Sequence, residues 1–107
     1  ILIDAGGLAL SKDNSAREFL ANAGYGLVCG LSDAAPVDGL YVAEVHQEHG
    51  LIAAVTGEPP FEAFPIGRKL RILPNHACMT AAAHEAYWVT DGSGSVIARW
   101  ERVNGWG

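Results

Sequence analysis

Residues 39–50, GLYVAEVHQEHG, alternate between two sets of side chains in the pattern that is typical of a β-strand. LIAAV follows directly after Gly50 as a second short apolar run. We therefore expect two consecutive strands here. The alternation places four residues of the first strand on one face: Leu40, Val42, Glu44 and His46.

Similar runs lie on both sides of this stretch. ILIDAGGLAL (1–10) predicts an apolar strand that ends near two Gly, YGLVCG (25–30) a short strand, and IGRKLRILP (66–74) another alternating strand. LSDAAPVDG (31–39) is rich in turn formers and predicts a loop. EAYWVTDGSGSVIARWERV (85–103) has two β-rich runs around DGSG, which predicts a hairpin over 87–103, with Trp88 and Trp100 packed.

Little helix is expected between these runs. SKDNSAREFLANAG (11–24) carries Ala16, Phe19, Leu20 and Ala23 at helical spacing, so a short helix and a structured loop both fit. TGEPPFEAFP (56–65) cannot be regular, because its three Pro interrupt any ladder or helix. The sequence thus predicts a mainly β fold: a small β-barrel or sandwich-like domain of short antiparallel strands, with residues 1–107 as a single domain.

Composition excludes several classes of partner. The net charge is −5 and there is no basic run, so neither nucleic acid nor an anionic membrane surface is an expected partner. No apolar run approaches the roughly 20 residues that cross a bilayer. Two Cys do not make a disulfide framework, which favours a reducing, cytoplasmic setting. The chain begins without Met inside a predicted strand, which fits a piece of a longer protein, and processing would produce the same start.

His76 and Cys78 stand two residues apart, directly after Pro74 and Asn75. At the end of a strand, residues i and i+2 face the same way, about 6.6 Å apart at ~3.3 Å per residue. An imidazole and a thiolate together are a zinc-type ligand pair. Ordinary core packing of the cysteine is the alternative, and two ligands fall short of the three that catalytic zinc usually has. His84 is a candidate third ligand.

The order of several short motifs resembles the C-terminal domain of the D-serine dehydratase and D-threonine aldolase family. These are pyridoxal-phosphate enzymes of alanine-racemase-like fold. The motifs are IDAG (3–6), ALSKD (9–13), YG (25–26), QEHG (47–50), PIGRKLRILPNHAC (65–78), YWVTDG (87–92) and NGW (104–106). They span nearly the whole chain in order, and PNHAC combined with EHG is the most specific part.

The resemblance implies a function for a complete protein. It implies a lyase that removes water, and then ammonia, from a β-hydroxy D-amino acid such as D-serine, with His76 and Cys78 as ligands of a zinc ion. Cys78 favours zinc over manganese or magnesium, because the harder ions prefer oxygen ligands. Pyridoxal phosphate would be bound by an N-terminal barrel of the same protein, and a homodimer is the expected assembly. Neither Lys12 nor Lys69 has the context of a cofactor lysine, so the chain alone is expected to be inactive.

Alternatives remain open at this stage. An aldolase that cleaves D-threonine or 3-hydroxy-aspartate fits the same family, and a non-catalytic β-domain that binds a ligand or a partner chain is a different class of reading. His49 in QEHG is either an active-site residue or a turn residue, and Glu48 either orients a ligand imidazole or is solvated. His46 is expected to form a surface pair with Glu44, and Cys29 to lie in the core.

Overall fold

The computed structural model describes residues 1–32 and 35–103, and it is mainly β. Seven strands are present in this part of the chain: β1 (Leu2–Ile3), β2 (Gly26–Cys29), β3 (Pro36–Val45), β4 (Gly50–Ala54), β5 (Arg71–Pro74), β6 (Ala86–Thr90) and β7 (Val96–Glu101). The helical pieces are short: α1 (Gly7–Leu10), α2 (Ala77–Ala82), and two 3-10 turns at Ser15–Glu18 and Phe61–Ala63. The predicted fold class is confirmed. None of the described helices is of a length and apolarity that would span a membrane.

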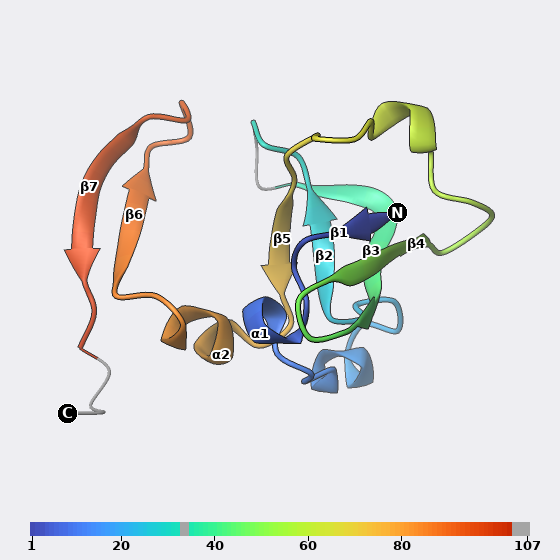
Figure 1. The fold of residues 1–107 in the computed structure, drawn as a ribbon, viewed down its shortest axis with the longest axis horizontal. Helices are drawn as coiled ribbons and strands as arrows, with labels where there is room; N and C mark the ends of the chain where they lie inside the picture. Colours follow the sequence, from blue (N-terminus) through green and yellow to red (C-terminus); the bar gives the residue numbers. More distant parts are fainter. Residues whose placement is uncertain (33–34, 104–107) are drawn as a thin grey trace.

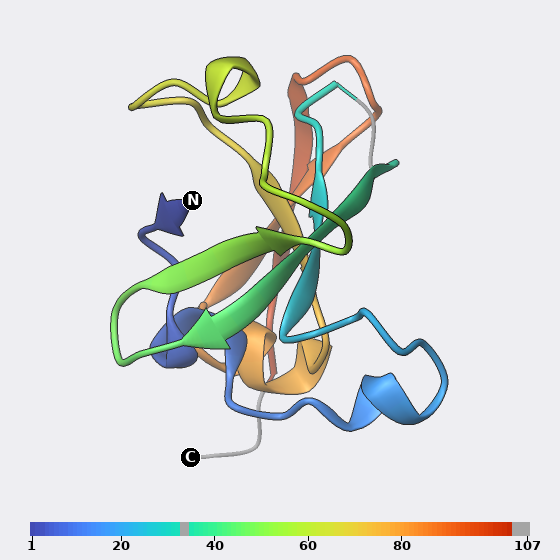
Figure 2. The ribbon, with the colours of Figure 1, turned by 90° about the vertical axis from the view of Figure 1, so that its right-hand side faces the viewer.

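Five strands form one antiparallel sheet in the order β1-β4-β3-β2-β5, which curls into a half-barrel (Figures 1 and 2). Leu2 pairs with Leu51 in β4, and Gly26 pairs with Pro74 in β5. In consequence the end of β1, the β3–β4 turn, the start of β2 and the end of β5 lie at the same end of the sheet. Both helices are found at this end, and α1 contacts α2.

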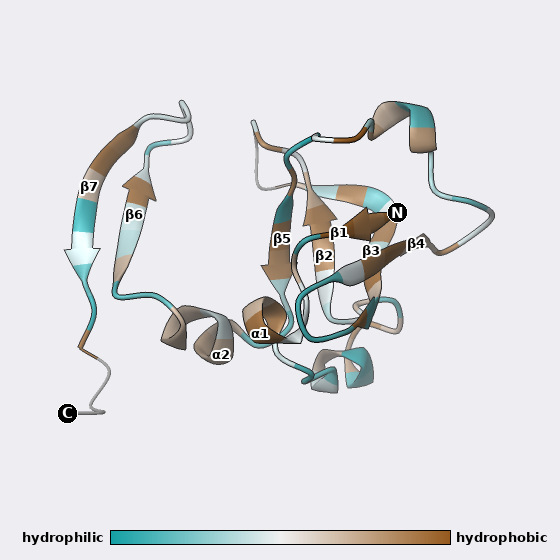
Figure 3. Ribbon diagram, in the orientation of Figure 1, coloured by the Kyte–Doolittle hydropathy of each residue, from teal (hydrophilic) through white to brown (hydrophobic). Residues whose placement is uncertain are grey.

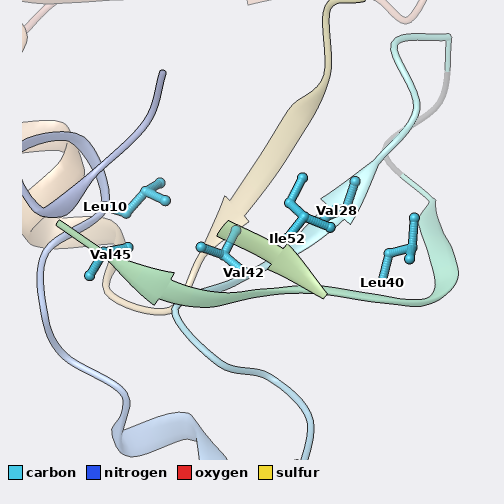
Figure 4. Packing of buried hydrophobic residues seen from close by; sticks show 6 residues of the cluster. All are labelled: Leu10, Val28, Leu40, Val42, Val45 and Ile52. Carbon is cyan, nitrogen blue, oxygen red and sulfur yellow. The ribbon is translucent and has the colours of Figure 1, made fainter. Parts of the chain in front are cut away.

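The core lies on the concave side of this sheet and is small. Its buried members come from α1 and the three central strands (Figure 4): Leu10, Val28, Leu40, Val42, Val45 and Ile52. In Figure 3 the hydrophobic colour follows β2 and β4 in the sheet. Cys29 is also fully buried, as the sequence predicted, and neither it nor Cys78 forms a disulfide.

The alternation predicted for residues 40–46 is wrong in its second half. The pairing register of β3 on β4 shifts between Val42 and Glu44, at a β-bulge or similar irregularity. Such an irregularity inserts an extra residue and reverses the inward and outward positions beyond it. Val45 is therefore buried with Leu40 and Val42, while Glu44 and His46 are exposed. Burial of Val45 in place of a carboxylate is the physical reason for the bulge.

Other boundaries also differ from the sequence prediction. The predicted loop at 31–39 ends earlier, because β3 begins at Pro36, and the first residue of a strand is a position that tolerates proline. The strand predicted at the N-terminus is only Leu2–Ile3, and Gly7–Leu10 is helical. Segment 11–24 is a loop with one 3-10 turn, which is one of the two alternatives that fit its sequence, and Phe19 is 91% exposed.

The predicted hairpin is confirmed as β6 and β7, with Tyr87 opposite Trp100. It stands apart from the main sheet as a separate two-stranded ribbon (Figure 1). The packing expected for its tryptophans is wrong: Trp88 is 65% exposed and Trp100 is 62% exposed. A ribbon with no covering layer among the described residues has no interior in which to bury both rings.

Arg102 anchors this hairpin to α2. Its Nη1 donates to the carbonyl oxygen of His84 at 2.9 Å and to that of Ala81, both at the end of α2. Its guanidinium also lies over the Tyr87 ring, 5.8 Å from the centroid. The Ala81 carbonyl also accepts the His84 N–H, so Arg102 is a second donor to it, and a cation at a helix C-terminus is favoured by the helix dipole.

Candidate metal-binding site

The turn from β5 into α2 places His76 and Cys78 differently from the strand-end prediction. β5 ends at Pro74, and His76 is the residue before α2, with extended backbone at φ −118° and ψ 90°. Cys78 is the second residue of α2, which begins at Ala77. The two side chains therefore do not share a strand face. Helical propensity of ACMTAA explains the change, because a short alanine-rich turn forms once packing supports it.

The two side chains nonetheless remain available as ligands. Cys78 is an exposed free thiol, and the His76 side chain is 37% exposed. Within residues 1–32 and 35–103, no group of three or more His, Cys, Asp and Glu side chains is arranged to hold a metal ion. His84 is exposed at the end of α2, and no described cluster joins it to this pair. The role predicted for His76 and Cys78 stays a prediction.

One orientation of the His76 ring is fixed by Asp13. The Nδ1 atom of His76 lies 2.6 Å from Oδ2 of Asp13. An ionised carboxylate can only accept a hydrogen bond, so the neutral imidazole donates from Nδ1 and keeps its lone pair on Nε2. An imidazole held in this way is the arrangement that accompanies histidine ligands of metals.

Asp13 is itself held by the loop that follows α1. Its Oδ1 accepts the backbone N–H of Ser15 at 2.8 Å, and its own N–H donates to Oγ of Ser11 at 2.8 Å. Hydrogen bonds from the Ser15 backbone and side chain, and then from His76, lower the pKa of the Asp13 carboxyl below its ordinary value. The group is therefore a carboxylate at neutral pH.

Asn75 joins the same loop to the start of α2. Its Oδ1 accepts the N–H of Ala16 at 3.1 Å, and its Nδ2 donates to the carbonyl of Gly24 at 3.0 Å. Two independent connections thus link segment 13–16 to residues 75–76. These two contacts span 59 and 51 positions of the sequence, so no local pattern indicates them.

The QEHG turn lies against the start of α1. Gly7 N–H donates to the His46 carbonyl at 2.6 Å, and Leu8 N–H to the Gln47 carbonyl at 3.1 Å. His49 is exposed, and its ring stacks on that of His46 with centroids 4.6 Å apart. His46 Nε2 lies 3.8 Å from Glu44 Oε2, which confirms the expected surface pair. Among the residues that the structure describes, no hydrogen bond or ion pair joins His49 to His76 or Cys78, so its active-site role stays a prediction.

Asp13 is the site residue that sequence reasoning missed. Asp13 belongs to the ALSKD motif, which by itself indicates no role for it, whereas the sequence suggests an orienting role for Glu48 as an alternative to a solvated carboxylate. Glu48 is an exposed residue of the 46–49 turn. The sequence holds no local signal for the Asp13 contact, because 63 positions separate Asp13 from His76.

Comparison with known proteins shows that the chain is similar to dehydratases. The chain is 40% identical to D-threo-3-hydroxyaspartate dehydratase of Delftia sp. (strain HT23), over 98% of this chain and 28% of that protein. The solved structure of that dehydratase superposes with a TM-score of 0.82. An alanine-racemase-like protein from Idiomarina loihiensis is 44% identical, with a TM-score of 0.80, over 98% of this chain and 27% of that one. D-Serine dehydratase of Schizosaccharomyces pombe is 31% identical, over 99% of this chain and 23% of its own length.

Residues 1–90 match the family model described as "Putative serine dehydratase domain", and the chain belongs to this family. It spans about a quarter of the length of the relatives named above. The Delftia dehydratase has also been solved as two alanine variants, one at a cysteine and one at a histidine, and the cysteine variant is described as metal-free. In that protein's numbering the two replaced residues are two positions apart.

Proposed function

We propose that this chain is the metal-binding β-domain of a dehydratase that acts on a β-hydroxy D-amino acid, with His76 and Cys78 as zinc ligands. One observation carries the proposal: their spacing equals that of the histidine and cysteine replaced in the variants of a relative 40% identical to this chain. Local geometry supports it, since Nε2 of His76 and the Cys78 thiol are both free of other partners among the described residues.

The donor set fits zinc. A neutral imidazole and a thiolate are borderline-soft ligands that suit Zn²⁺ better than Mg²⁺ or Mn²⁺, which prefer oxygen. Two protein ligands leave coordination positions open, as a site that must also bind substrate requires. Zinc at this place would act as a Lewis acid toward the substrate's β-hydroxyl and so ease loss of water. Asp13 and Asn75 would keep the two ligands in place.

The rest of the reaction belongs to parts of the complete protein outside this chain. Pyridoxal phosphate, bound there, would supply the electron sink for proton loss at the substrate α-carbon. Lys12 and Lys69 are the only lysines of the chain, and both are exposed. We therefore expect the 107-residue chain alone to show no turnover and no stoichiometric adduct with pyridoxal phosphate. A second domain, a homodimer and a cytoplasmic location complete the proposal.

The experiment compares Cys78→Ala with a matched cysteine control in the complete protein. Cys78→Ala should lose bound zinc and most dehydratase turnover while it keeps pyridoxal phosphate, and Cys78→Asp should shift metal preference toward manganese. Cys29→Ala removes a thiol that is buried in β2 and should retain zinc. Undiminished zinc with normal turnover in Cys78→Ala would contradict the metal site.

Substrate assays separate the remaining alternatives. D-Serine, D-threo-3-hydroxyaspartate and D-threonine are supplied to the wild-type protein, and the products are identified. Ammonia with a keto acid supports the dehydratase. Glycine together with an aldehyde, which is glyoxylate in the case of 3-hydroxyaspartate, would assign the chain to an aldolase. Absence of any turnover, with zinc also absent, would favour a non-catalytic binding domain.

A further inference from the structure

The geometry points to Asp13 as a positioning residue that sets the tautomer of His76, so that Nε2 faces outward as the ligand nitrogen. This inference rests on the proposed metal site and adds to it a residue that takes no part in coordination. It requires that the Asp13 carboxylate accept from Nδ1 at 2.6 Å, as it does here.

The contact is built into the fold. Ser11, which ends α1, is buried at 7% exposure and has φ 66° and ψ 169°, a conformation that non-glycine residues rarely adopt. A residue held there is strained, and the surrounding structure must offset that strain. Its backbone turns the chain out of α1, and its Oγ accepts the N–H of Asp13. The strained residue therefore directs Asp13 toward His76.

Both carboxylate oxygens of Asp13 are used, and by different partners. Oδ1 accepts from the Ser15 backbone in a turn, and Oδ2 faces His76. The hairpin loop contains the same turn without the histidine: Oδ1 of Asp91 accepts the Ser93 N–H at 2.9 Å. The chain thus offers an internal control in which an aspartate of equal local geometry contacts no imidazole among the described residues.

Asparagine at position 13 gives a test that distinguishes positioning from simple structural support. Asp13→Asn keeps the turn, because Oδ1 still accepts from Ser15, but it places an NH₂ group where Oδ2 was. An NH₂ group can only donate, so Nδ1 of His76 must become the acceptor and its proton must move to Nε2. The ligand nitrogen is then blocked. Asp13→Ala removes the acceptor and leaves the ring free to choose either tautomer.

The order of the two effects carries the inference. We expect zinc affinity to fall about 10–100-fold in Asp13→Asn and by less in Asp13→Ala, the range that loss of an orienting partner typically costs. A merely structural role predicts the reverse order, because asparagine is the more conservative replacement. Asp91→Asn, with the same chemical change in the hairpin, should leave zinc affinity unchanged.

Two measurements on the complete protein test the inference. Zinc affinity is measured by competition with a chromophoric chelator for wild type, Asp13→Asn, Asp13→Ala and Asp91→Asn, each checked for native secondary structure by circular dichroism. Imidazole ¹⁵N spectra of the zinc-free protein then report the tautomer; they are recorded at a pH well above about 6.5, the ordinary pKa of an imidazole, so that the ring is neutral. His76→Gln identifies the His76 signals.

The outcomes separate the two proposals. A proton on Nδ1 of His76 in wild type and on Nε2 in Asp13→Asn, with the predicted order of affinities, supports the inference. Wild-type zinc binding that is lost in Cys78→Ala but unaffected by Asp13→Asn, or an unchanged tautomer, overturns it while leaving the metal site intact. Wild type that binds no zinc overturns the proposed function, and the tautomer result then stands alone as a structural finding.

Discussion

Replacement of Gly6 by alanine should disrupt the junction between the N-terminal segment and the β3–β4 turn. A Cβ atom at Gly6 would lie 2.5 Å from the His49 nitrogen, 2.6 Å from the His46 carbonyl oxygen and 2.7 Å from the carbonyl carbon of Glu48. All three are backbone atoms, so no side-chain rotation relieves the clash. Gly6 has φ −108° and ψ −157°, which alanine also adopts, so the cost is steric alone.

The magnitude follows from these distances. Backbone of the turn must retreat by about 0.5 Å merely to reach 3.0 Å from the new atom. Overpacking of this kind typically costs about 1–3 kcal/mol. The same movement lengthens the hydrogen bonds from Gly7 to His46 and from Leu8 to Gln47. Each contributes roughly 1 kcal/mol net, which places the expected loss near the upper end of that range.

Gly7→Ala is the matched control. Its nearest backbone atom is the His46 oxygen at 3.2 Å, and its other neighbours belong to the flexible Lys12 side chain. Alanine also has a higher intrinsic helix propensity than glycine, so propensity does not oppose this replacement. Urea unfolding of the complete protein, followed by far-ultraviolet circular dichroism, should show a lower midpoint for Gly6→Ala and little change for Gly7→Ala. Equal midpoints for the two variants would refute the steric reasoning.

Three further experiments test other parts of the fold. Arg102→Ala should loosen the hairpin and speed amide hydrogen exchange in β6 and β7, because the carbonyls of Ala81 and His84 lose the hydrogen bonds that Arg102 donates. Unchanged exchange rates would contradict the anchoring role of Arg102. Val42→Ala should cost roughly 2–3 kcal/mol in urea unfolding, since this side chain is fully buried, whereas Phe19→Ala should change stability by less than about 0.5 kcal/mol; comparable losses would contradict the assigned burial. The Ser93 amide should shift in an NMR titration as the pH falls through the pKa of Asp91, which is lowered because its side-chain and backbone hydrogen bonds with Ser93 favour the charged carboxylate. The stability that this turn contributes is present above the ordinary pKa of 3.8 and is lost as the pH falls through the lowered pKa of the folded state. A transition above pH 3.8 would contradict the lowered pKa.

Local sequence patterns predicted the strands and the hairpin well but not the irregularities between them. The alternation of residues 40–46 is real up to Val42, and the bulge that follows depends on pairing with β4. Sequence periodicity cannot show such a pairing, although the apolar Val45 is a weak signal for it. Segment 11–24 fits both a helix and a loop, because helical spacing alone does not guarantee an element against which a helix face could pack; the structure has the loop, with Phe19 exposed.

For the site, too, local features could be predicted from the sequence and long-range contacts could not. His76 and Cys78 stood out because rare residue types occurred close together, and the family of the chain was recognisable from short motifs in order. The extended backbone predicted for the pair is wrong for Cys78, which lies in α2, whereas His76 is extended. Asp13 could not be paired with His76 from sequence, since nothing local specifies a contact across 63 positions.

Sheet topology explains why these distant motifs meet. Pairing of Ile3 with Gly50 brings the chain out of β1 beside the turn that ends at His49, so α1 begins against that turn. Pairing of Gly26 with Pro74 ends β5 at the same end of the sheet, and α2 then starts beside α1. A one-residue slip of β5 would invert its inward and outward side chains and move His76 by about 3.3 Å along the strand direction. The hydrogen bond to Asp13, at 2.6 Å, would not survive that displacement. The register of β5 on β2 is therefore as much a part of the candidate site as the ligands themselves.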